Sequence, residues 1–253
     1  MKQLHASSAV DGFEFQDLAE WDSRGPPRDV VTKTYRPETW KSCPKYGLKD
    51  RAELLKGASV ISVHANRDVG ICLCSEDSAE IDIGRSIMND TFRLSKEIGA
   101  HLVVFHLWDT YATNFDPAFL KSELKKASSD FPSIVSSVEN VPTHLEGSTP
   151  FDLARRFDFI TLDTRWAGLY NELDEFQEIS HKIVNVHLRG ALEGNEWVLH
   201  DAPFAFMEAF DKIRNEWAIP GPYTVEPERG HGIPTMEGAI DSLRKMKSNL
   251  SQS

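Results

Sequence analysis

The sequence is poor in cysteine and has no paired framework for disulfide bonds. Only three cysteines occur among its 253 residues: Cys43, Cys72 and Cys74. An odd number without regular spacing argues for a reducing compartment. Cys72 and Cys74 form a C-x-C pair, which is neither a zinc-ribbon knuckle nor a redox C-x-x-C motif. We therefore expect three plain thiols, each packed as a small apolar side chain.

Long hydrophobic runs are also missing. No stretch approaches the ~18 to 20 consecutive apolar residues that are needed to span a bilayer. The first residues, MKQLHASSAVDGFEFQ, lack the basic segment and following apolar run of a secretory signal. Together with the unpaired cysteines, these absences predict a cytoplasmic protein without a membrane partner.

Basic residues are outnumbered and scattered along the chain. The formal net charge is -11, and the densest basic stretch, KSELKKA at 121–127, looks like a solvated helix face. An acidic surface repels phosphate backbones, so the charge counts against a nucleic-acid partner. Bound metal ions, however, would add positive charge that the residue count omits.

Short apolar runs rich in β-branched residues alternate with amphipathic segments of helical period, which is typical of repeated βα units. Strands are predicted at 58–64, 100–106, 133–139, 158–163, 182–187 and 222–226. Runs this short fit strands that are buried on both faces of a parallel sheet. A length of 253 residues is also typical of a TIM barrel. We predict a single α/β domain over 1–253, folded as a (β/α)₈ barrel.

Helix starts and apolar stripes occupy the segments between these strands. Asp116-Pro117 and Thr149-Pro150 are typical cap-then-proline starts, and Asp201 is a candidate cap ahead of Pro203. Two segments, 201–217 and 235–246, have apolar residues at helical spacing. The first stripe comprises Phe206, Met207, Phe210, Ile213 and Trp217, and the second Met236, Ile240 and Leu243. Both stripes are expected to face the core.

The N-terminal part follows the βα pattern less clearly. Residues 12–15 (GFEF) look like a strand, and 2–8 are a candidate for a short strand before it. Because no full helix fits between them, the first βα unit is predicted to be abbreviated or irregular. The Pro-rich stretch 21–47 is predicted to be a loop over the barrel mouth rather than a linker between domains.

The residues that end the predicted strands carry the functional information. The six runs end, in chain order, at His64, His106, Glu139, Asp163, His187 and Glu226. Taken singly, each has an ordinary structural explanation as a core histidine, a salt-bridge partner or a helix cap. In a parallel barrel, however, the carboxyl ends of the strands meet at one face. Burying six such groups together is costly unless they are paired or bind metal.

This mixture of imidazoles and carboxylates predicts a divalent metal site. It suits Zn²⁺, Mn²⁺, Co²⁺ or Fe²⁺ better than Ca²⁺ or Mg²⁺. Zn²⁺ and Mn²⁺ are the metals we expect first.

Six fragments, in order, resemble the xylose-isomerase-like TIM barrel superfamily, which contains the sugar isomerases and epimerases and endonuclease IV (AP endonuclease family 2). They are VHAN, VVFHLWD, VENVP, LDTRWAG, VHLRG and TVEPE, and the resemblance covers residues 55–246. It implies that Glu139, Asp163, His187 and Glu226 are the shared metal ligands. It also implies that His64, His106 and His200 match further ligands of the endonuclease IV cluster.

Two positions depart from the family pattern. The family commonly has a histidine three residues after the Asp163 match, where this chain has Trp166. The endonuclease pattern has an acidic residue two positions before the His200 match, where this chain has Val198. Two of the three ligands for a third zinc are therefore missing. The histidine replaced by Trp166 also binds substrate in the ketose epimerases, so that subclass does not follow from the resemblance.

The interpretation that we favour is a metal-dependent sugar or sugar-phosphate isomerase or epimerase. The resemblance implies that Glu139 and Glu226 face each other across the metal, where they would transfer a proton at the carbon beside a carbonyl. An endonuclease IV-like phosphodiesterase is the alternative that His64 and His106 favour, and Trp166, Val198 and the acidic charge oppose it. A metal- or sugar-binding protein without catalysis is the third reading.

Four further residues are candidates for substrate binding. Arg165 and Arg189 each stand two positions after a predicted ligand, where they would bind a phosphate or carboxylate or else neutralise the ligand carboxylates. Trp166 and Trp108 belong to loops rich in aromatic and small polar residues, which suit the apolar face of a sugar. The expected partner is a small sugar or sugar phosphate. A homo-oligomer is compatible with the sequence, which does not set the oligomeric state.

The cysteine pattern gives a direct prediction. Thiol titration of the denatured, non-reduced protein should count three free groups. A count of one would mean that two cysteines are bridged, and the assignment to a reducing compartment would be wrong.

Overall fold

The computed structural model describes residues 11–28, 37–193, 196–198 and 206–227. The chain divides into two compact units, one formed by 14–161 and the other by 1–13 with 162–253. The boundaries fall inside the first and fifth strands, so they cut through secondary-structure elements rather than through linkers. The single domain over 1–253 stays a prediction.

The unit 14–161 contains a sheet whose strand order follows the chain. Its strands are β1 (Phe13–Gln16), β2 (Val60–His64), β3 (Leu102–Phe105), β4 (Val135–Glu139) and the start of β5 (Ile160–Asp163). β2, β3, β4 and β5 pair in parallel, with His64 opposite Val104, Phe105 opposite Val138 and Glu139 opposite Thr161. The parallel register therefore brings the carboxyl ends of β2, β3 and β4 to the same edge of the sheet.

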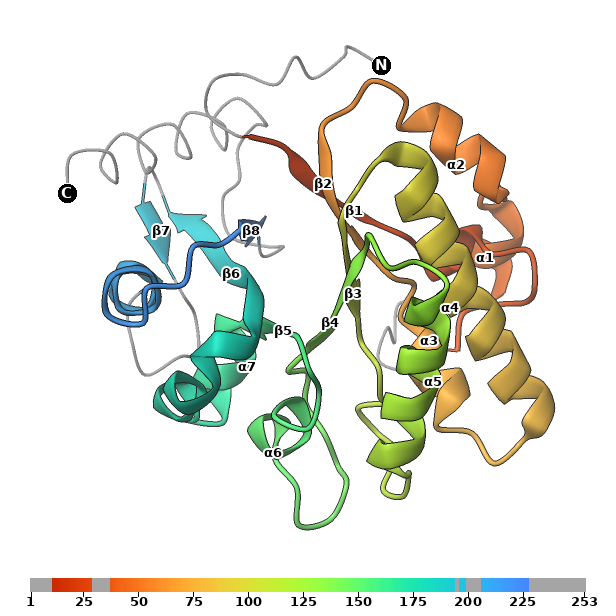
Figure 1. The fold of residues 1–253 in the computed structure, drawn as a ribbon. Helices are drawn as coiled ribbons and strands as arrows, with labels where there is room; N and C mark the ends of the chain where they lie inside the picture. Colours follow the sequence, from red (N-terminus) through yellow and green to blue (C-terminus); the bar gives the residue numbers. More distant parts are fainter. Residues whose placement is uncertain (1–10, 29–36, 194–195, 199–205, 228–253) are drawn as a thin grey trace. The chain divides into compact units, whose positions relative to one another are not determined.

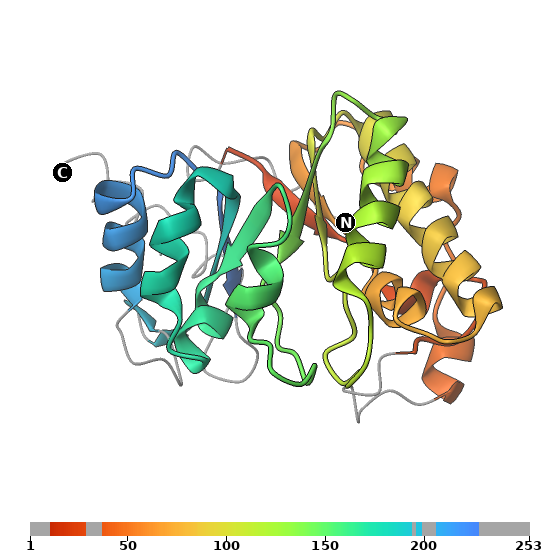
Figure 2. The same ribbon diagram turned by 60° about the horizontal axis from the view of Figure 1, so that its bottom comes forward.

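Helices α2 (Leu48–Leu54), α3 (Asp68–Leu73), α4 (Ser78–Ile98) and α5 (Pro117–Ser129) lie on one side of these strands in Figures 1 and 2. The short helix α6 (Pro150–Ala154) lies below the strands in Figure 1. Asp116 caps α5 by accepting a hydrogen bond from the Ala118 N–H at 2.8 Å, and Thr149 forms a capping box at the start of α6. Both predicted cap-then-proline starts are therefore confirmed.

The Pro-rich segment is not wholly a loop, and in this respect the prediction was wrong. A short 3₁₀ helix, η1 (Ala19–Trp21), precedes it, and α1 (Pro37–Ser42) forms within it. Local side-chain contacts hold the segment: the Trp40 Nε1–H donates to the Asp22 carbonyl at 3.2 Å, and the Lys45 ammonium lies 4.5 Å from the Trp40 ring centroid. The first of these contacts joins residues 18 apart in the sequence, so composition alone does not reveal it.

The other unit contains the end of β5 and all later described elements. These are α7 (Thr164–Leu169), η2 (Leu173–Lys182), β6 (Ile183–Glu193), β7 (Glu196–Val198), α8 (Phe206–Asp211), the π-helical turn η3 (Lys212–Glu216) and β8 (Tyr223–Pro227). β6 and β8 are parallel, with Arg189 opposite Glu226, whereas β6 and β7 form an antiparallel pair. The strand predicted at 182–187 is therefore too short, because β6 continues to Glu193 to reach β7.

The predicted stripe of the helical segment 201–217 is confirmed where its side chains are described. Phe210, Ile213 and Trp217 are buried. The side chains of Phe206 and Met207, the cap Asp201 and the last predicted helix (235–246) lie outside the described residues, as does the strand predicted at 2–8. Among the described helices, none combines the length and the apolar character that crossing a membrane requires.

The cysteines are free thiols, as the sequence predicts. Burial raises the pKa of the Cys72 thiol to about 12, and that of the Cys74 thiol to about 12 as well. Both are therefore protonated and unreactive at neutral pH.

A glycine in α3 allows the helix to approach the chain that follows β3. A Cβ atom at Gly70 would lie 2.5 Å from the His106 carbonyl oxygen and 2.8 Å from the Trp108 backbone N. Because these are backbone atoms, Gly70→Ala should lower the free energy of unfolding by about 2 kcal/mol or more. Chemical denaturation measures this loss, and Ser122→Ala on the exposed face of α5 is the control. Equal stability of the two variants would mean that α3 does not approach this backbone so closely.

Candidate metal-binding site

Three predicted ligands converge within the unit 14–161, and we call them the His64 cluster: His64, His106 and Glu139. His64 and Glu139 end β2 and β4, and His106 directly follows β3. Each Nε2 atom of the two imidazoles lies 3.0 Å from the same Glu139 oxygen, Oε2. The ring centroids are 4.8 Å apart with the ring planes edge to face. Two nitrogens and one oxygen therefore meet at one point beyond the strand ends.

Two features of the His64 cluster suit its imidazoles to metal binding. The His64 Nδ1 atom lies 3.0 Å from the Ala65 carbonyl oxygen, to which it can donate a proton and leave the Nε2 lone pair for a metal. Burial lowers the pKa of His106 to about 4, although the nearby Glu139 carboxylate opposes this shift. Neutral imidazole and ionised carboxylate are the forms that bind metal. The candidate ligand atoms lie within 4.8 Å of one another, so this donor set fits a divalent transition metal.

Three other predicted ligands, Asp163, His187 and Glu226, belong to the second unit. Asp163 is buried at the end of β5 and caps α7, where its Oδ1 accepts hydrogen bonds from the backbone N–H groups of Arg165 and Trp166. The buried His187 has its Nδ1 atom 3.4 Å from Glu226 Oε1. Asp163 ends β5 and Glu226 stands next to the end of β8, as the sequence predicts, whereas His187 lies inside β6, which continues to Glu193.

Arg189 links two of these carboxylates. Its Nε and Nη2 atoms lie 3.1 and 3.0 Å from Glu226 Oε2, and its Nη1 atom lies 3.7 Å from Asp163 Oδ2. The register of β6 against β8 places Arg189 opposite Glu226 and so produces the pair. Of the two roles that the sequence left open for Arg189, these ion pairs favour neutralisation of the ligand carboxylates.

Trp166, which stands where the family commonly has a histidine, contacts both predicted arginines. The guanidinium carbon of Arg165 lies 5.3 Å from the Trp166 ring centroid, and that of Arg189 lies 5.2 Å away. Stacking of this kind holds a guanidinium in place without consuming its hydrogen-bond donors. The Trp166 ring thus packs against the guanidinium groups of Arg165 and Arg189.

Trp108 and His200 complete the set of predicted site residues. Trp108 is buried, its Nε1–H donates to the Pro142 carbonyl at 3.0 Å, and its ring stacks on Phe157. These contacts connect the loops that follow β3 and β4, and a contact with substrate stays a prediction. His200 lies outside the described residues.

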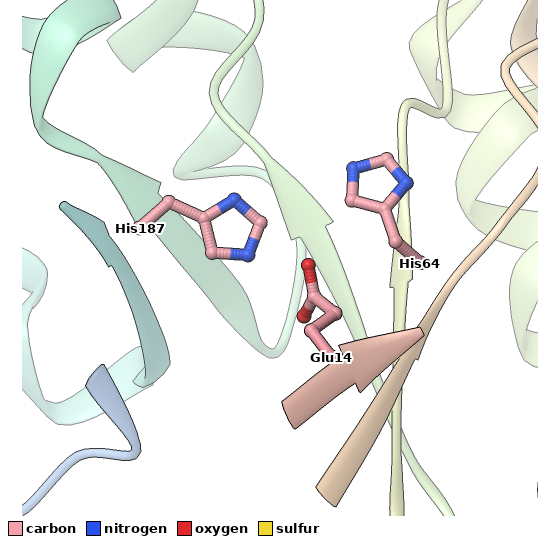
Figure 3. A group of neighbouring side chains, drawn as sticks. All are labelled: Glu14, His64 and His187. Carbon is pink, nitrogen blue, oxygen red and sulfur yellow. The ribbon is translucent and has the colours of Figure 1, made fainter. Parts of the chain in front are cut away.

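Sequence reasoning missed Glu14, which lies on β1 beside His64. The Ser62 hydroxyl donates a hydrogen bond to Glu14 Oε2 at 2.6 Å. A Glu14 carboxylate oxygen and a His64 ring nitrogen lie within 4.8 Å of one another, and Figure 3 shows both side chains as they leave their strands. His187, also labelled in Figure 3, belongs to the second unit. The GFEF strand was recognised, but nothing in its sequence places Glu14 next to β2.

No protein-family model matches the chain, and no curated protein matches it in sequence. Solved structures do match. An L-ribulose 3-epimerase gives a TM-score of 0.61 at 13% identity, covering 95% of this chain and 94% of that chain. A 3-keto-D-glucoside 4-epimerase from E. coli gives a TM-score of 0.60 at 12% identity, covering 94% of this chain and 100% of that chain.

A D-allulose 3-epimerase from Methylomonas sp. is a further match. Its TM-score is 0.58 at 13% identity, and the alignment covers 96% of this chain and 87% of that chain. Identities this low establish the fold and nothing finer. The predicted fold class, an α/β TIM barrel, is confirmed.

The donor set of the His64 cluster predicts bound metal. Protein purified without chelator should carry at least one divalent transition metal per chain, and Glu139→Ala and His187→Ala should each lower that content. Metal that binds only the folded state should also raise the melting temperature. Elemental analysis measures the content, and Glu146→Ala, which removes an exposed carboxylate after β4, is the matched control. Negligible metal in all four proteins would contradict the site.

Proposed function

We propose that the protein is a divalent-metal-dependent isomerase or epimerase that acts on a small sugar or sugar phosphate. The observation that carries the proposal is the convergence of two imidazoles on the Glu139 carboxylate at the strand ends. The fold supports it, because the matching solved structures with this fold include an L-ribulose 3-epimerase and a D-allulose 3-epimerase. The ligand side chains are buried, which suits a reaction of a small molecule in a site that excludes water.

The proposed metal ligands are those that the family resemblance implies: Glu139, Asp163, His187 and Glu226, with His64, His106 and His200 as further ligands. Zn²⁺ and Mn²⁺ suit these donors best, and Co²⁺ or Fe²⁺ would also be accepted. When bound, the metal would polarise the substrate carbonyl and stabilise negative charge that develops on oxygen.

Glu139 and Glu226 are the proposed proton-transfer residues. One carboxylate removes the proton from the carbon beside the carbonyl, and the other returns a proton to give the epimer or isomer. The guanidinium of Arg189 holds Glu226 Oε2 through two contacts and so fixes the orientation of that carboxylate. The two imidazoles fix Glu139 Oε2 in the same way. Side chains held in place by such contacts need no reorganisation before the reaction.

Arg165 is the proposed binding residue for a substrate phosphate or carboxylate. It begins α7, and the Trp166 ring stabilises its guanidinium from one face. Arg189, which forms ion pairs with Asp163 and Glu226, is the other candidate. Trp166 would contribute an apolar surface beside it.

Proton transfer at carbon gives a specific test. The metal-loaded protein should incorporate deuterium from deuterated water at the carbon beside the carbonyl of at least one ketose, aldose or phosphate in a panel. Glu226→Gln should slow this exchange by about 100-fold or more, because general acid–base catalysis contributes about 10² to 10⁴ in rate. NMR or mass spectrometry follows the exchange, and Glu178→Gln at an exposed position of η2 serves as the control.

The same preparations separate this function from the phosphodiesterase alternative. An oligonucleotide with a single abasic site should remain intact, because the net charge of -11 opposes DNA binding. Metal-dependent strand cleavage that Glu226→Gln abolishes, without exchange into any sugar, would replace the proposed function by the alternative.

A further inference from the structure

A buried ion pair in the unit 14–161 has no role in the proposed mechanism. Arg51 on α2 pairs through its Nη1 atom with Oδ2 of Asp17, which directly follows β1. Both side chains are buried, and neither Asp17 Oδ1 nor Arg51 Nε has a hydrogen-bond partner among the described residues. Burial raises the pKa of the Asp17 carboxyl above its ordinary value, although Arg51 opposes this shift. The pair is therefore kept in spite of a cost in desolvation.

Stability alone does not explain a pair of this kind. Replacing a buried ion pair by apolar side chains of similar volume is often neutral or stabilising, because the charges no longer have to leave water. The two unsatisfied polar atoms add to the cost of the pair. A buried ion pair does, however, require one relative position of its two groups, which apolar contacts do not. Here it fixes the chain after β1 against α2.

The backbone of Asp17 in turn holds His64. The Asp17 N–H donates to the His64 carbonyl at 2.9 Å, and the Ala65 N–H donates to the Val104 carbonyl at 2.8 Å. The two hydrogen bonds hold the peptide group between His64 and Ala65 at both of its polar atoms. Because a peptide group is planar, they fix its orientation.

The His64 ring depends on this peptide group through the next carbonyl. Its Nδ1 atom lies 3.0 Å from the Ala65 carbonyl oxygen, which can only accept, so Nδ1 carries a proton in this contact. The other ring nitrogen, Nε2, lies 3.0 Å from Glu139 Oε2. A hydrogen bond at the nitrogen that does not bind metal is what orients a metal-binding histidine. The contacts thus run from Arg51 through the Asp17 backbone to the ring.

We propose that Asp17 and Arg51 are positioning residues: their ion pair holds the backbone at His64 so that the ring keeps Nδ1 on the Ala65 carbonyl and Nε2 toward Glu139. The consequence for metal affinity rests on the proposed function, whereas the orientation of the ring does not depend on bound metal. Neither residue contacts the metal or the substrate in this role.

The test has two readouts. Competition with a chelator gives the Kd for Zn²⁺, and NMR of the metal-free protein gives the solvent exchange of the His64 Nδ1 proton, which His64→Gln assigns. Arg51→Met should weaken the Kd by about tenfold, because loss of a contact that orients a ligand histidine typically costs about 10- to 100-fold in metal affinity. The Nδ1 proton should exchange about tenfold faster than in wild type, where the Ala65 carbonyl protects it.

A second variant separates positioning from stability. Asp17→Leu/Arg51→Met replaces the ion pair by apolar side chains, so its melting temperature should stay close to that of wild type. Its zinc affinity and proton exchange should nevertheless match those of Arg51→Met, because the required position of the two groups is lost. Arg85→Met is the matched control: Arg85 on α4 pairs with the buried Glu123 on α5 at 2.6 Å. Its loss should change neither readout.

Wild-type affinity and exchange in Arg51→Met would overturn the inference and leave the proposed function in place. Recovery of both readouts in the apolar double variant would also overturn it, since the pair would then only stabilise the fold. A wild-type protein that binds no zinc would remove the proposed function. The exchange of the metal-free proteins then decides the inference alone: faster exchange in Arg51→Met supports it, and equal exchange, or an unprotected Nδ1 proton in wild type, overturns it.

Discussion

The Glu139 carboxylate and the two imidazoles that converge on its Oε2 atom are the interaction on which the candidate site depends. All three side chains are largely removed from water, and a buried carboxylate is costly unless its oxygens are paired. The low pKa of His106 means that this imidazole offers a lone pair rather than a positive charge at neutral pH. Without metal, an Nε2–H group of either ring can donate to Glu139 Oε2; with metal bound, the Nε2 lone pairs would face the ion instead. A divalent metal satisfies all three, which is why this cluster supports a metal enzyme more strongly than any single residue does.

Backbone geometry holds the cluster together. The parallel register of β2, β3 and β4 brings His64, His106 and Glu139 to one edge of their sheet. Gly70 allows α3 to pack against the backbone of His106 and Trp108, and Trp108 donates to Pro142 in the loop after β4. The chain directly after β3 and the chain directly after β4 are therefore fixed by contacts outside the cluster. In the second unit, the register of β6 and β8 acts similarly on Arg189 and Glu226.

The sequence predicted the βα alternation and the strand-end residues because both arise from local pattern and from the direction of parallel strands. Five of the six predicted ligands lie at or next to the carboxyl ends of strands: His64, His106, Glu139, Asp163 and Glu226. His187 lies inside β6, because that strand continues beyond its predicted end. The structure departs from the prediction where contacts between residues distant in the sequence determine the local structure. β6 extends to Glu193 because it pairs with β7, and α1 forms inside a Pro-rich stretch that looked like loop. Glu14 was missed for the same reason, because its hydrogen bond with Ser62 joins residues 48 apart in the sequence.

Anomalous diffraction tests most directly whether these side chains bind a divalent transition metal. Crystals of protein purified without chelator and supplied with Mn²⁺ or Zn²⁺ would be measured on both sides of the metal absorption edge. We expect an anomalous peak about 2.0 to 2.3 Å from a Glu139 carboxylate oxygen, with at least one ring nitrogen of His64, His106 or His187 at a similar distance. A fully loaded crystal with anomalous peaks only at surface carboxylates, and none within coordination distance of Glu139, would contradict it.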